Sequence, residues 1–540
     1  MKEMKVQCKF YKREENMKLK KISSLFVLTS AALAMLASCG PNTEIPGDET
    51  PTVDLVDDRE LDDDNKTVLF DNVELKLWAV GGEPDSSTLN GLINDFNKEY
   101  AGQINISVNN INEENYYGQL DTTWRNDKTS FPDIMWIHNN KISLYASKAK
   151  QYILPLTEEV LEKSNCQLDF SNVYEGIDRV NMYNGTRYSM SVDAHGFLTY
   201  FRQDIIKKNN LGFENNTRYI PESKAEYQSL LEGLTNKAKA GQLYTRDINK
   251  GQDHSWKIAP ASFAASFMQS SDPDGLTALY ANGGSLMDET QDRVTFHENQ
   301  GFIKYCTDQV ENYNKGYITT GTNTALFGTG NIAMFSEGPW WSASNYEPNF
   351  NNSELKTAGK GVSAEEAADP VYSQPLVSSH AKGWWTLDEN KSSATAQKWY
   401  GLGHSICASR NIKSYTKVAA MMEFTNWFTQ GKNSKTNEYN LAKWCSSGHI
   451  PAWKNVYASD EYKALAEKKA TLRGLGDPAD IIALESLEFQ DTLFSALQTT
   501  IVSIQSALTG DGCTVDKAKQ IIAESGQACQ ESVDALKILG

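Results

Sequence analysis

Strand-like and helix-like segments alternate along the chain from Val73 onward, and this pattern restricts it to a small group of folds. Alternating apolar and polar residues predict a strand, and apolar residues that recur three and four positions apart predict a helix. The predicted strands are residues 73–80, 104–108 and 132–137, and the predicted helices between them are residues 89–96 and 117–125. Repetition of strand, helix and strand predicts an α/β fold with a parallel sheet covered by helices.

The loops after these strands are the first candidates for a binding site, because ligands of open parallel sheets bind outside the carboxyl ends of the strands. Glu83 lies in the loop after the first strand, and His138, Asn139 and Asn140 follow the third. Amide groups both donate and accept hydrogen bonds, which suits the recognition of hydroxyl groups. The alternatives are that Glu83 belongs to a surface turn and that the asparagines only cap their loop.

The start of the chain predicts export from the cell. A short positive segment from Met17 to Lys21 runs into the apolar stretch 22–36. This stretch is shorter than the ~20 residues that a membrane-spanning helix needs, and it has the length of the core of a secretory signal peptide. The residues before Met17 add no apolar character, so Met17 is a second candidate for the true start.

The apolar stretch ends in Leu-Ala-Ser-Cys-Gly at residues 36–40, which resembles a bacterial lipobox. The resemblance implies that residues 1–38 are removed as a signal peptide and that Cys39 carries a diacylglycerol anchor. Ser38 departs from the Gly or Ala that is usual at its position. The alternative is a buried N-terminal helix that ends in a free cysteine.

An acidic segment, residues 39–70, follows the predicted cleavage site. It is rich in Pro, Gly, Thr and Asp and holds too few apolar residues to bury a core, so we predict a flexible, solvated linker. A metal-binding acidic loop is the alternative, but the acidic run at residues 57–64 lacks the glycine turn of a calcium loop.

Charge and missing motifs exclude several classes of function. A formal net charge of −17 at pH 7 argues against a broad electropositive surface for nucleic acid. The chain has no Gly-x-Ser-x-Gly elbow, no His-Glu-x-x-His helix and no Gly-x-x-x-x-Gly-Lys phosphate-binding loop. Its 7 histidines are scattered without metal-binding spacing, so we predict neither a metal nor a cofactor. Among 69 acidic residues, a pair of carboxylates at the distance that a glycosidase needs is expected by chance. Such a pair therefore does not distinguish a glycosidase from a binding protein.

Four motifs resemble family 1 of the extracellular solute-binding proteins of ABC importers, the group with maltose-binding-protein-like members. They are residues 184–195, 282–288, 328–340 and 448–452. Residues 328–340 are the most specific, because the family typically has a Gly, an Ala-Met pair, a short polar run and then Gly-Pro-Trp, here Gly338-Pro339-Trp340. The resemblance covers most of residues 73–460 and weakens afterwards.

The resemblance implies a type II periplasmic-binding-protein fold, in which two α/β lobes with parallel-rich sheets and flanking helices close on a ligand in a hinged cleft. We expect the crossings between the lobes near residues 191–195 and 403–405. Lobe 1 is expected over residues 71–192 with a return segment at 405–466, and lobe 2 over residues 193–404 with C-terminal helices at 467–540.

The function that the resemblance implies is binding without chemistry. We expect a monomeric, lipid-anchored protein on the outer face of the cytoplasmic membrane or in the periplasm, which captures an oligosaccharide and delivers it to the permease subunits of an ABC importer. A secreted glycoside hydrolase, a binding protein for a peptide or polyol, and a sensor that presents its solute to a membrane receptor are the alternatives.

Trp340 is the first site residue that the resemblance implies, since it matches a tryptophan that stacks on a sugar ring in carbohydrate-binding members. A flat aromatic face can cover the apolar C–H face of a pyranose. The alternative is a core tryptophan, which is the role we predict for Trp341. Trp384, Trp385 and Trp256 add aromatic surface, and we expect only one of the three, Trp384, to meet the ligand.

The polar site residues carry less specific signals. Asn139 and Asn140 stand where maltose-type members have an Asp-Arg pair that grips sugar hydroxyls, which argues against maltose itself as the ligand. Asp193 and His195 flank the first crossing, where the family often places a polar residue that faces the ligand. The alternative is a polar pair that bonds to the backbone of the hinge.

Overall fold

The computed structural model describes residues 53–539, apart from residues 65, 149, 269–272, 322, 342–352, 381–382, 483 and 485–486. The predicted signal peptide, the lipid attachment at Cys39 and the first part of the predicted linker lie outside the described residues. Within the described part of the chain, no helix has both the length and the hydrophobicity that crossing a bilayer requires.

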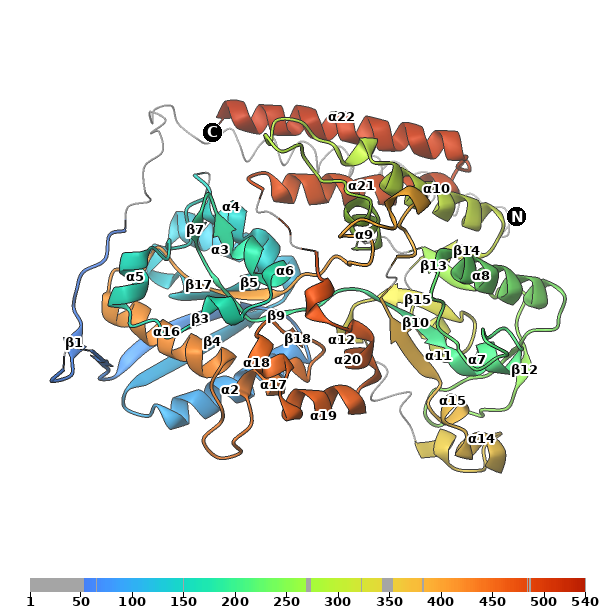
Figure 1. Cartoon of the computed structure of the whole chain (residues 1–540), viewed down its shortest axis with the longest axis horizontal. Coiled ribbons are helices and arrows are strands. Elements are labelled where there is room, and N and C mark those ends of the chain that lie inside the picture. Colours follow the sequence, from blue (N-terminus) through green and yellow to red (C-terminus); the bar gives the residue numbers. More distant parts are fainter. Residues whose placement is uncertain are drawn as a thin grey trace, which may run out of the picture. The chain divides into compact units, whose positions relative to one another are not determined.

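A five-stranded sheet, called sheet A here, is built by the first half of the described chain and one later strand (Figure 1). Its strand order is β4-β3-β5-β17-β8, with bounds β3 Val73–Val80, β4 Ile104–Ile111, β5 Ile134–His138, β8 Met190–Ser191 and β17 His404–Ala408. Strand β3 pairs in parallel with β4 and β5, while β17 is antiparallel to both of its neighbours. The three predicted strands and their parallel pairing are confirmed.

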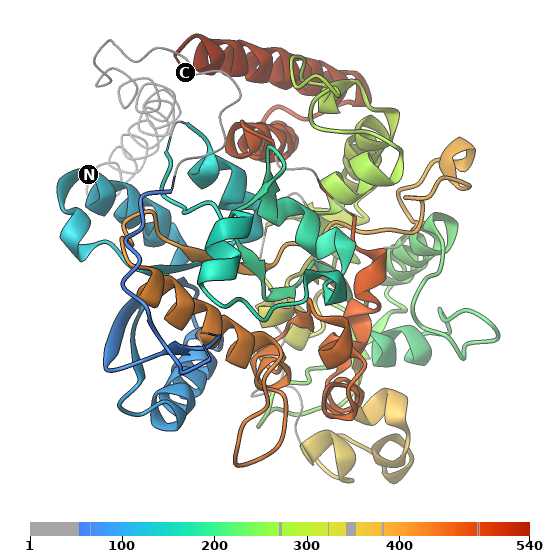
Figure 2. The same cartoon turned by 60° about the vertical axis from the view of Figure 1, so that its left-hand side comes forward.

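Helices α2 (Asp85–Glu99), α3 (Glu113–Asn126) and α16 (Tyr415–Thr429) pack against sheet A (Figure 2). In α2 the apolar residues at helical spacing are all buried, and they are Leu89, Leu92, Ile93 and Phe96. The ring of Phe96 meets Phe424 and Trp427 of α16 edge to face, with centroids 5.1 and 5.3 Å apart. The predicted helices 89–96 and 117–125 are therefore confirmed as parts of α2 and α3.

A second, three-stranded sheet, called sheet B, has β10 (Leu198–Arg202) between β15 (Met334–Glu337) and β16 (Leu376–Ser379). Both pairings are antiparallel, so sheet B departs from the parallel-rich arrangement that we expected. The direction of β15 agrees with its ring contact: β10 begins just after His195 and runs away from it, whereas β15 runs toward Trp340, whose ring lies against that histidine.

Longer helices share one hydrophobic core with sheet B, and they are α8 (Lys224–Lys239), α9 (Pro273–Ala281), α10 (Gln300–Asn314), α21 (Gln490–Thr509) and α22 (Val515–Leu539). Helices α21 and α22 lie side by side and pack on α10 (Figure 1). The start of α21 also contacts the loop after β5, since Lys141 Nζ lies 2.6 Å from Asp491 Oδ1. The C-terminal helices therefore contact both α10 and the loop after β5.

Short strands and helices lie between these longer elements and are separated by turns and loops. The short strands are β1 Glu60–Leu61, β2 Val68–Leu69, β6 Met182–Tyr183, β7 Thr186–Arg187, β9 Asp193–Ala194, β11 Tyr244–Thr245, β12 Lys257–Ile258, β13 Ser266–Met268, β14 Ile318–Thr320 and β18 Ile450–Pro451. The short helices are α4 Ile142–Ala146, α5 Glu158–Lys163, α6 Glu175–Asp178, α7 Gln203–Lys208, α11 Ala325–Gly328, α12 Pro339–Trp341, α14 Ala364–Ala368, α15 Pro370–Ser373, α17 Asn440–Cys445, α18 Lys454–Tyr457, α19 Asp460–Lys468 and α20 Ala470–Leu475.

Two antiparallel crossing segments connect sheet A to sheet B. The backbone N–H of His195 donates to the Leu402 carbonyl at 2.7 Å, and the N–H of Leu402 donates back at 2.8 Å. A Cβ atom at Gly403 would lie 2.0 Å from the Asp193 carbonyl oxygen, so glycine permits this close approach. Strand β9, which contains Asp193, also pairs with β18. Three segments that are far apart in sequence therefore meet here.

Residues 53–70 differ from the solvated linker that the composition predicts. Strands β1 and β2 pair with each other, and Val56 forms a bridge to Ser414. Asp58 accepts a hydrogen bond of 3.0 Å from the backbone N–H of Thr416. The first turn of α16 leaves N–H groups without helical partners, and the acidic segment supplies acceptors for them. The linker prediction is therefore wrong for these residues, because its acidic groups cap a helix of the body.

Candidate functional site

Four buried side chains converge where the crossing segments meet, and they are Asp193, His195, His404 and His449. Asp193 is in β9 and His195 follows it, His404 begins β17, and His449 directly precedes β18. One donor atom from each of the four lies within 4.8 Å of the other three. We call this group the histidine cluster.

Asp193 is the central acceptor of the histidine cluster. Its Oδ1 accepts the backbone N–H of His404 at 2.9 Å, and its Oδ2 accepts the indole N–H of Trp444 and lies 3.0 Å from His404 Nδ1. Burial raises the pKa of Asp193, but the charges of His404 and His449 and its hydrogen bonds outweigh burial and hold that pKa well below its usual value. Asp193 is therefore a buried anion that holds the imidazoles in place.

His449 lies between two carboxylates. Its Nε2 is 3.1 Å from Asp85 Oδ1, and its Nδ1 is 3.3 Å from His195 Nδ1. Burial lowers the pKa of His449, but the negative charges of Asp193 and Asp85 outweigh burial and raise it to about 9. Burial lowers the pKa of His195 to about 4, although Asp193 opposes the change. At neutral pH His449 is therefore charged and His195 is neutral.

Trp340 stands beside this cluster on the short helix α12. Its half-buried indole meets the His195 ring at a centroid distance of 5.4 Å and the Phe197 ring at 5.7 Å. A Cβ atom at residue 338 would lie 2.1 Å from the Trp340 ring, so Gly338 leaves the space into which the indole folds back. Trp341 is buried among aromatic rings, which confirms its predicted packing role.

The loop after β5 reaches the same place. The ring of His138 lies 5.2 Å from that of His404, and its Nδ1 is 2.9 Å from the Tyr117 hydroxyl. Asn139 is buried, and its backbone N–H donates to the Gly403 carbonyl at 2.8 Å. The side-chain oxygen of Asn140 is buried, and it has no hydrogen-bond partner among the described residues. This loop therefore brings the imidazole of His138 to the histidine cluster.

Two predicted site residues lie elsewhere. Glu83 is exposed and accepts a hydrogen bond of 2.8 Å from the Ser86 hydroxyl, as a residue of a surface turn does. Trp384 is buried and stacks on Tyr227 at 4.7 Å. Trp384 borders a cavity of about 540 Å³, but no residue that lines this cavity belongs to the histidine cluster. The structure thus brings together His138, Asp193, His195 and Trp340, whereas the contacts of Glu83 and Trp384 are with residues outside this group.

Sequence reasoning missed His404, His449, Asp85 and Trp444. Residues 403–405 are predicted only as a crossing and residues 448–452 only as a motif of the family, and the histidines have no metal-binding spacing along the chain. His404 and His449 contact Asp193 and His195 across 211 and 254 residues. A glycine precedes both histidines, His404 in the expected crossing 403–405 and His449 in the family-like motif 448–452, and this is the signal that could have found them.

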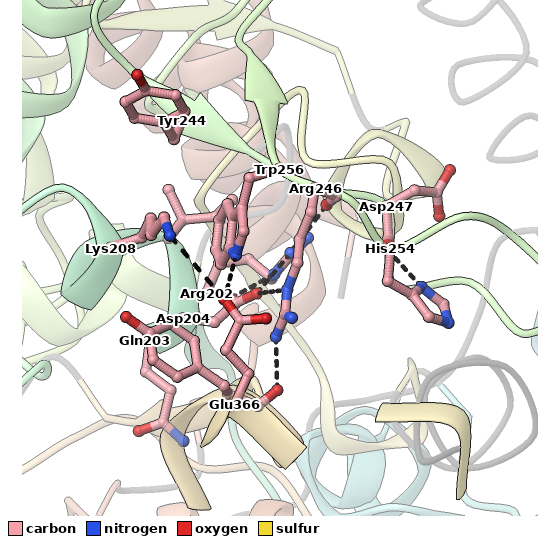
Figure 3. Close-up of polar contacts among 12 residues, drawn as sticks. Arg202, Gln203, Asp204, Lys208, Tyr244, Arg246, Asp247, His254, Trp256 and Glu366 are labelled. Carbon is pink, nitrogen blue, oxygen red and sulfur yellow. Dashed lines mark hydrogen bonds and ion pairs between the residues drawn. The ribbon is translucent and has the colours of Figure 1, made fainter. Parts of the chain in front are cut away.

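A second buried polar group lies near the end of β10 (Figure 3). Asp204 accepts hydrogen bonds of 2.9 Å from Arg202 and from Arg246, and all three side chains are fully buried. Arg246 lies over the Trp256 ring at 4.8 Å, and the Trp256 indole N–H donates to Glu366 at 2.7 Å (Figure 3). These contacts tie β10 to later segments, so Trp256 has a packing role in this group.

Comparison with known proteins finds one family. The model of the bacterial extracellular solute-binding proteins matches residues 91–470. No curated protein matches the sequence.

Solved structures resemble the chain over most of its length. The sugar-binding protein MalE of Xanthomonas citri is 15% identical with a TM-score of 0.60, and the alignment covers 86% of this chain and 99% of that one. An ABC substrate-binding protein of Listeria monocytogenes in complex with cycloalternan is 14% identical with a TM-score of 0.59, over 86% and 100%. UgpB of Mycobacterium tuberculosis in complex with glycerophosphocholine is 12% identical with a TM-score of 0.58, over 85% and 98%. These likenesses confirm the predicted α/β fold of the type II periplasmic-binding proteins.

Proposed function

Because this chain belongs to the bacterial extracellular solute-binding proteins, which serve ABC importers, we propose that the solute it captures is a carbohydrate of oligosaccharide size. Members of this family bind and are not enzymes, so the prediction of a binding protein is confirmed and the glycoside hydrolase alternative is set aside. The proposal concerns the chemistry of the solute and the residues that contact it.

The observation that carries the proposal is the position of Trp340. A half-buried indole beside the imidazole of His195 offers what a sugar needs, an apolar face for its C–H groups and a nearby hydrogen-bonding group for its hydroxyls. In this proposal Trp340 stacks on a ring, and His138 and Asn140 contact hydroxyls. His195 supports the indole from its edge, and Asp193 acts beneath the surface as the anchor of the imidazoles.

The same arrangement supports closure on the solute. Trp340 follows β15 of sheet B, whereas His138 ends β5 of sheet A and Asn140 follows it. A solute that contacts residues from both sheets binds more tightly when the two approach, and it favours the closed form only by that difference in affinity. The strands of sheet A come from residues 73–191 and 404–408 and those of sheet B from residues 198–379, which supports lobes bounded as we expected.

A lipid anchor completes the proposed setting. The signal-like segment and the lipobox-like residues 36–40 support attachment through Cys39 at the outer face of the membrane, close to the permease that receives the solute.

Two of the similar structures contain chemically different ligands, and one of these ligands defines a second candidate for the solute. The Listeria protein is in complex with cycloalternan, and the Mycobacterium protein is in complex with glycerophosphocholine. The unpartnered Asn140 oxygen favours a hydroxyl donor over a phosphate, because an anion would repel this acceptor.

A thermal-shift screen tests the proposal. The purified protein is heated with mono-, di- and oligosaccharides and with glycerophosphodiesters, and a ligand that binds the folded state raises the melting temperature. We expect a rise with one class of oligosaccharide and no product on chromatography. A rise with glycerophosphodiesters alone would replace the carbohydrate with the second candidate, and no rise with any sugar would contradict the proposal.

A further inference from the structure

The histidine cluster has the composition of a metal site. Three imidazoles and one carboxylate suit divalent transition metals such as Zn²⁺, whereas Mg²⁺ and Ca²⁺ prefer oxygen donors. We propose that Asp193, His195, His404 and His449 bind one divalent transition-metal ion of the zinc class. This proposal does not depend on the identity of the transported solute.

Two pairs of donor atoms already have nearly the spacing that a tetrahedral ion requires, and all four donors lie within 4.8 Å of one another. Bonds of about 2.0–2.1 Å to a tetrahedral Zn²⁺ place neighbouring donors about 3.3 Å apart. His449 Nδ1 lies 3.3 Å from His195 Nδ1, and His404 Nδ1 lies 3.0 Å from Asp193 Oδ2. The Nδ1 atoms of His195 and His449 each lie 3.8 Å from an Asp193 oxygen. An ion at this position would draw the more distant donors inward by rotation of their side chains.

The groups behind the donors are those that orient metal ligands. Asp85 Oδ1 lies 3.1 Å from His449 Nε2, which leaves Nδ1 of that ring to face the ion. Carboxylates commonly hold the second nitrogen of a metal-bound histidine in this way. Asp193 is oriented by the indole N–H of Trp444 and the backbone N–H of His404. The proposed ligands His449 and Asp193 are thus both oriented by hydrogen bonds to residues that do not bind the ion through those atoms.

Charge also favours a divalent cation. Asp85 and Asp193 bring two carboxylates to the cluster, and their ion-pair partners within the described part of the chain are histidines. Buried charges in proteins are paired or coordinate metals. A divalent ion bound by neutral imidazoles would balance the two carboxylates without any lysine or arginine.

A bound ion would stabilise the fold, because its ligands lie on segments that are far apart in the sequence. Its ligands come from β9 and the residue after it, from β17 and from the residue before β18, and these are the segments that meet at the crossing. An ion would therefore tie the crossing segments together and hold the imidazole of His195 against Trp340. We expect the bound ion to raise the thermal stability of the folded chain.

Metal content and metal titration test the proposal on the untagged protein. We expect elemental analysis to find one transition-metal ion per chain, or the chelator-treated protein to bind one Zn²⁺ with a rise in melting temperature. Co²⁺ should produce the strong visible absorption of a tetrahedral site. Absence of metal, of the cobalt spectrum and of any thermal shift would overturn the proposal and leave the cluster a hydrogen-bonded network.

Variants locate the site. We expect His195→Gln and His449→Gln each to weaken Zn²⁺ binding by more than about 100-fold, and Asp85→Asn, which removes an outer hydrogen bond, by about 10–100-fold. His297→Gln changes a histidine outside the cluster and should bind Zn²⁺ as the parent protein does. If a ligand variant does not fold, Asp85→Asn and the cobalt spectrum of the parent protein still decide. Equal binding by all variants would overturn the assignment.

Discussion

The indole of Trp340 meets the imidazole of His195 at nearly a right angle, with the ring centroids 5.4 Å apart. This contact joins the residue proposed to stack on the solute to the buried cluster at the crossing segments. Changes on either side of it have separable effects on solute binding and on stability.

Removal of the Trp340 ring should weaken carbohydrate binding without unfolding the protein. Trp340→Ala deletes the proposed stacking face, and we expect the affinity to fall at least about tenfold with little change in melting temperature, because the indole is half-buried. Trp341→Ala is the contrast, since it empties a buried site and should cost about 3–5 kcal/mol of unfolding free energy. Calorimetric titration and thermal melts measure both, and unchanged affinity in Trp340→Ala would remove Trp340 from the site.

Gly338 should control where the Trp340 ring lies. A methyl group at this position would lie 2.1 Å from the ring, so Gly338→Ala should push the indole away and lower carbohydrate affinity about tenfold. The matched control is Gly91→Ala in α2, where no atom lies within 4 Å of the added methyl group and helix propensity should rise by about 1 kcal/mol. If Gly338→Ala binds carbohydrate as tightly as Gly91→Ala, the indole does not need this space.

The cluster should make stability depend on pH in the metal-free protein. His449 faces Asp85, Asp193, His195 and His404, and its pKa is raised to about 9. A raised pKa contributes stability that is fully present below the unfolded value of about 6.5 and is lost as pH rises through 9. We expect His449→Gln to lose on the order of 3 kcal/mol relative to the parent at pH 6.5, and the difference to shrink as the pH rises from 6.5 to 9. Urea denaturation at several pH values measures this, and a constant difference would contradict it.

The group around Asp204 should be important for stability and not for binding. Asp204→Ala leaves Arg202 and Arg246 buried without their carboxylate, and we expect a loss of about 3–5 kcal/mol of unfolding free energy. Arg293→Ala removes an exposed ion pair with Glu298 and should cost less than about 1 kcal/mol. Chemical denaturation compares the two, and equal losses would show that burial of the pair makes no difference.

Lipid attachment at Cys39 has a direct test. We expect Cys39→Ser to abolish incorporation of labelled fatty acid and to release the protein from the membrane fraction, because serine lacks the thiol that the lipid transfer requires. Cys166→Ser, which changes a cysteine of the body, is the control and should stay attached. Equal lipid incorporation by both variants would contradict the lipobox assignment.

Local patterns in the sequence were sufficient for much of the fold. The apolar periodicities of β3, α2, β4 and β5 depend only on neighbouring residues, so their type and order could be predicted, and their parallel pairing followed from the strand–helix–strand repeat. The Gly338-Pro339-Trp340 motif was equally local, since the missing side chain of Gly338 is what leaves space for the indole.

Tertiary structure decided everything that depends on distant residues. His195 and His449 of the histidine cluster are 254 residues apart, and only the meeting of the crossing segments brings them within hydrogen-bonding distance. Trp340 and Trp384 each begin a Trp-Trp pair in the sequence, and only their burial distinguishes the candidate for solute contact from the core residue. Trp384 is buried in the core, whereas Trp340 is half-buried. The acidic residues before Val73 were also misjudged from composition, because the helix start that they cap lies more than 300 residues away. Spacing along a chain reports local geometry, whereas contact between distant segments depends on the packing of the whole fold.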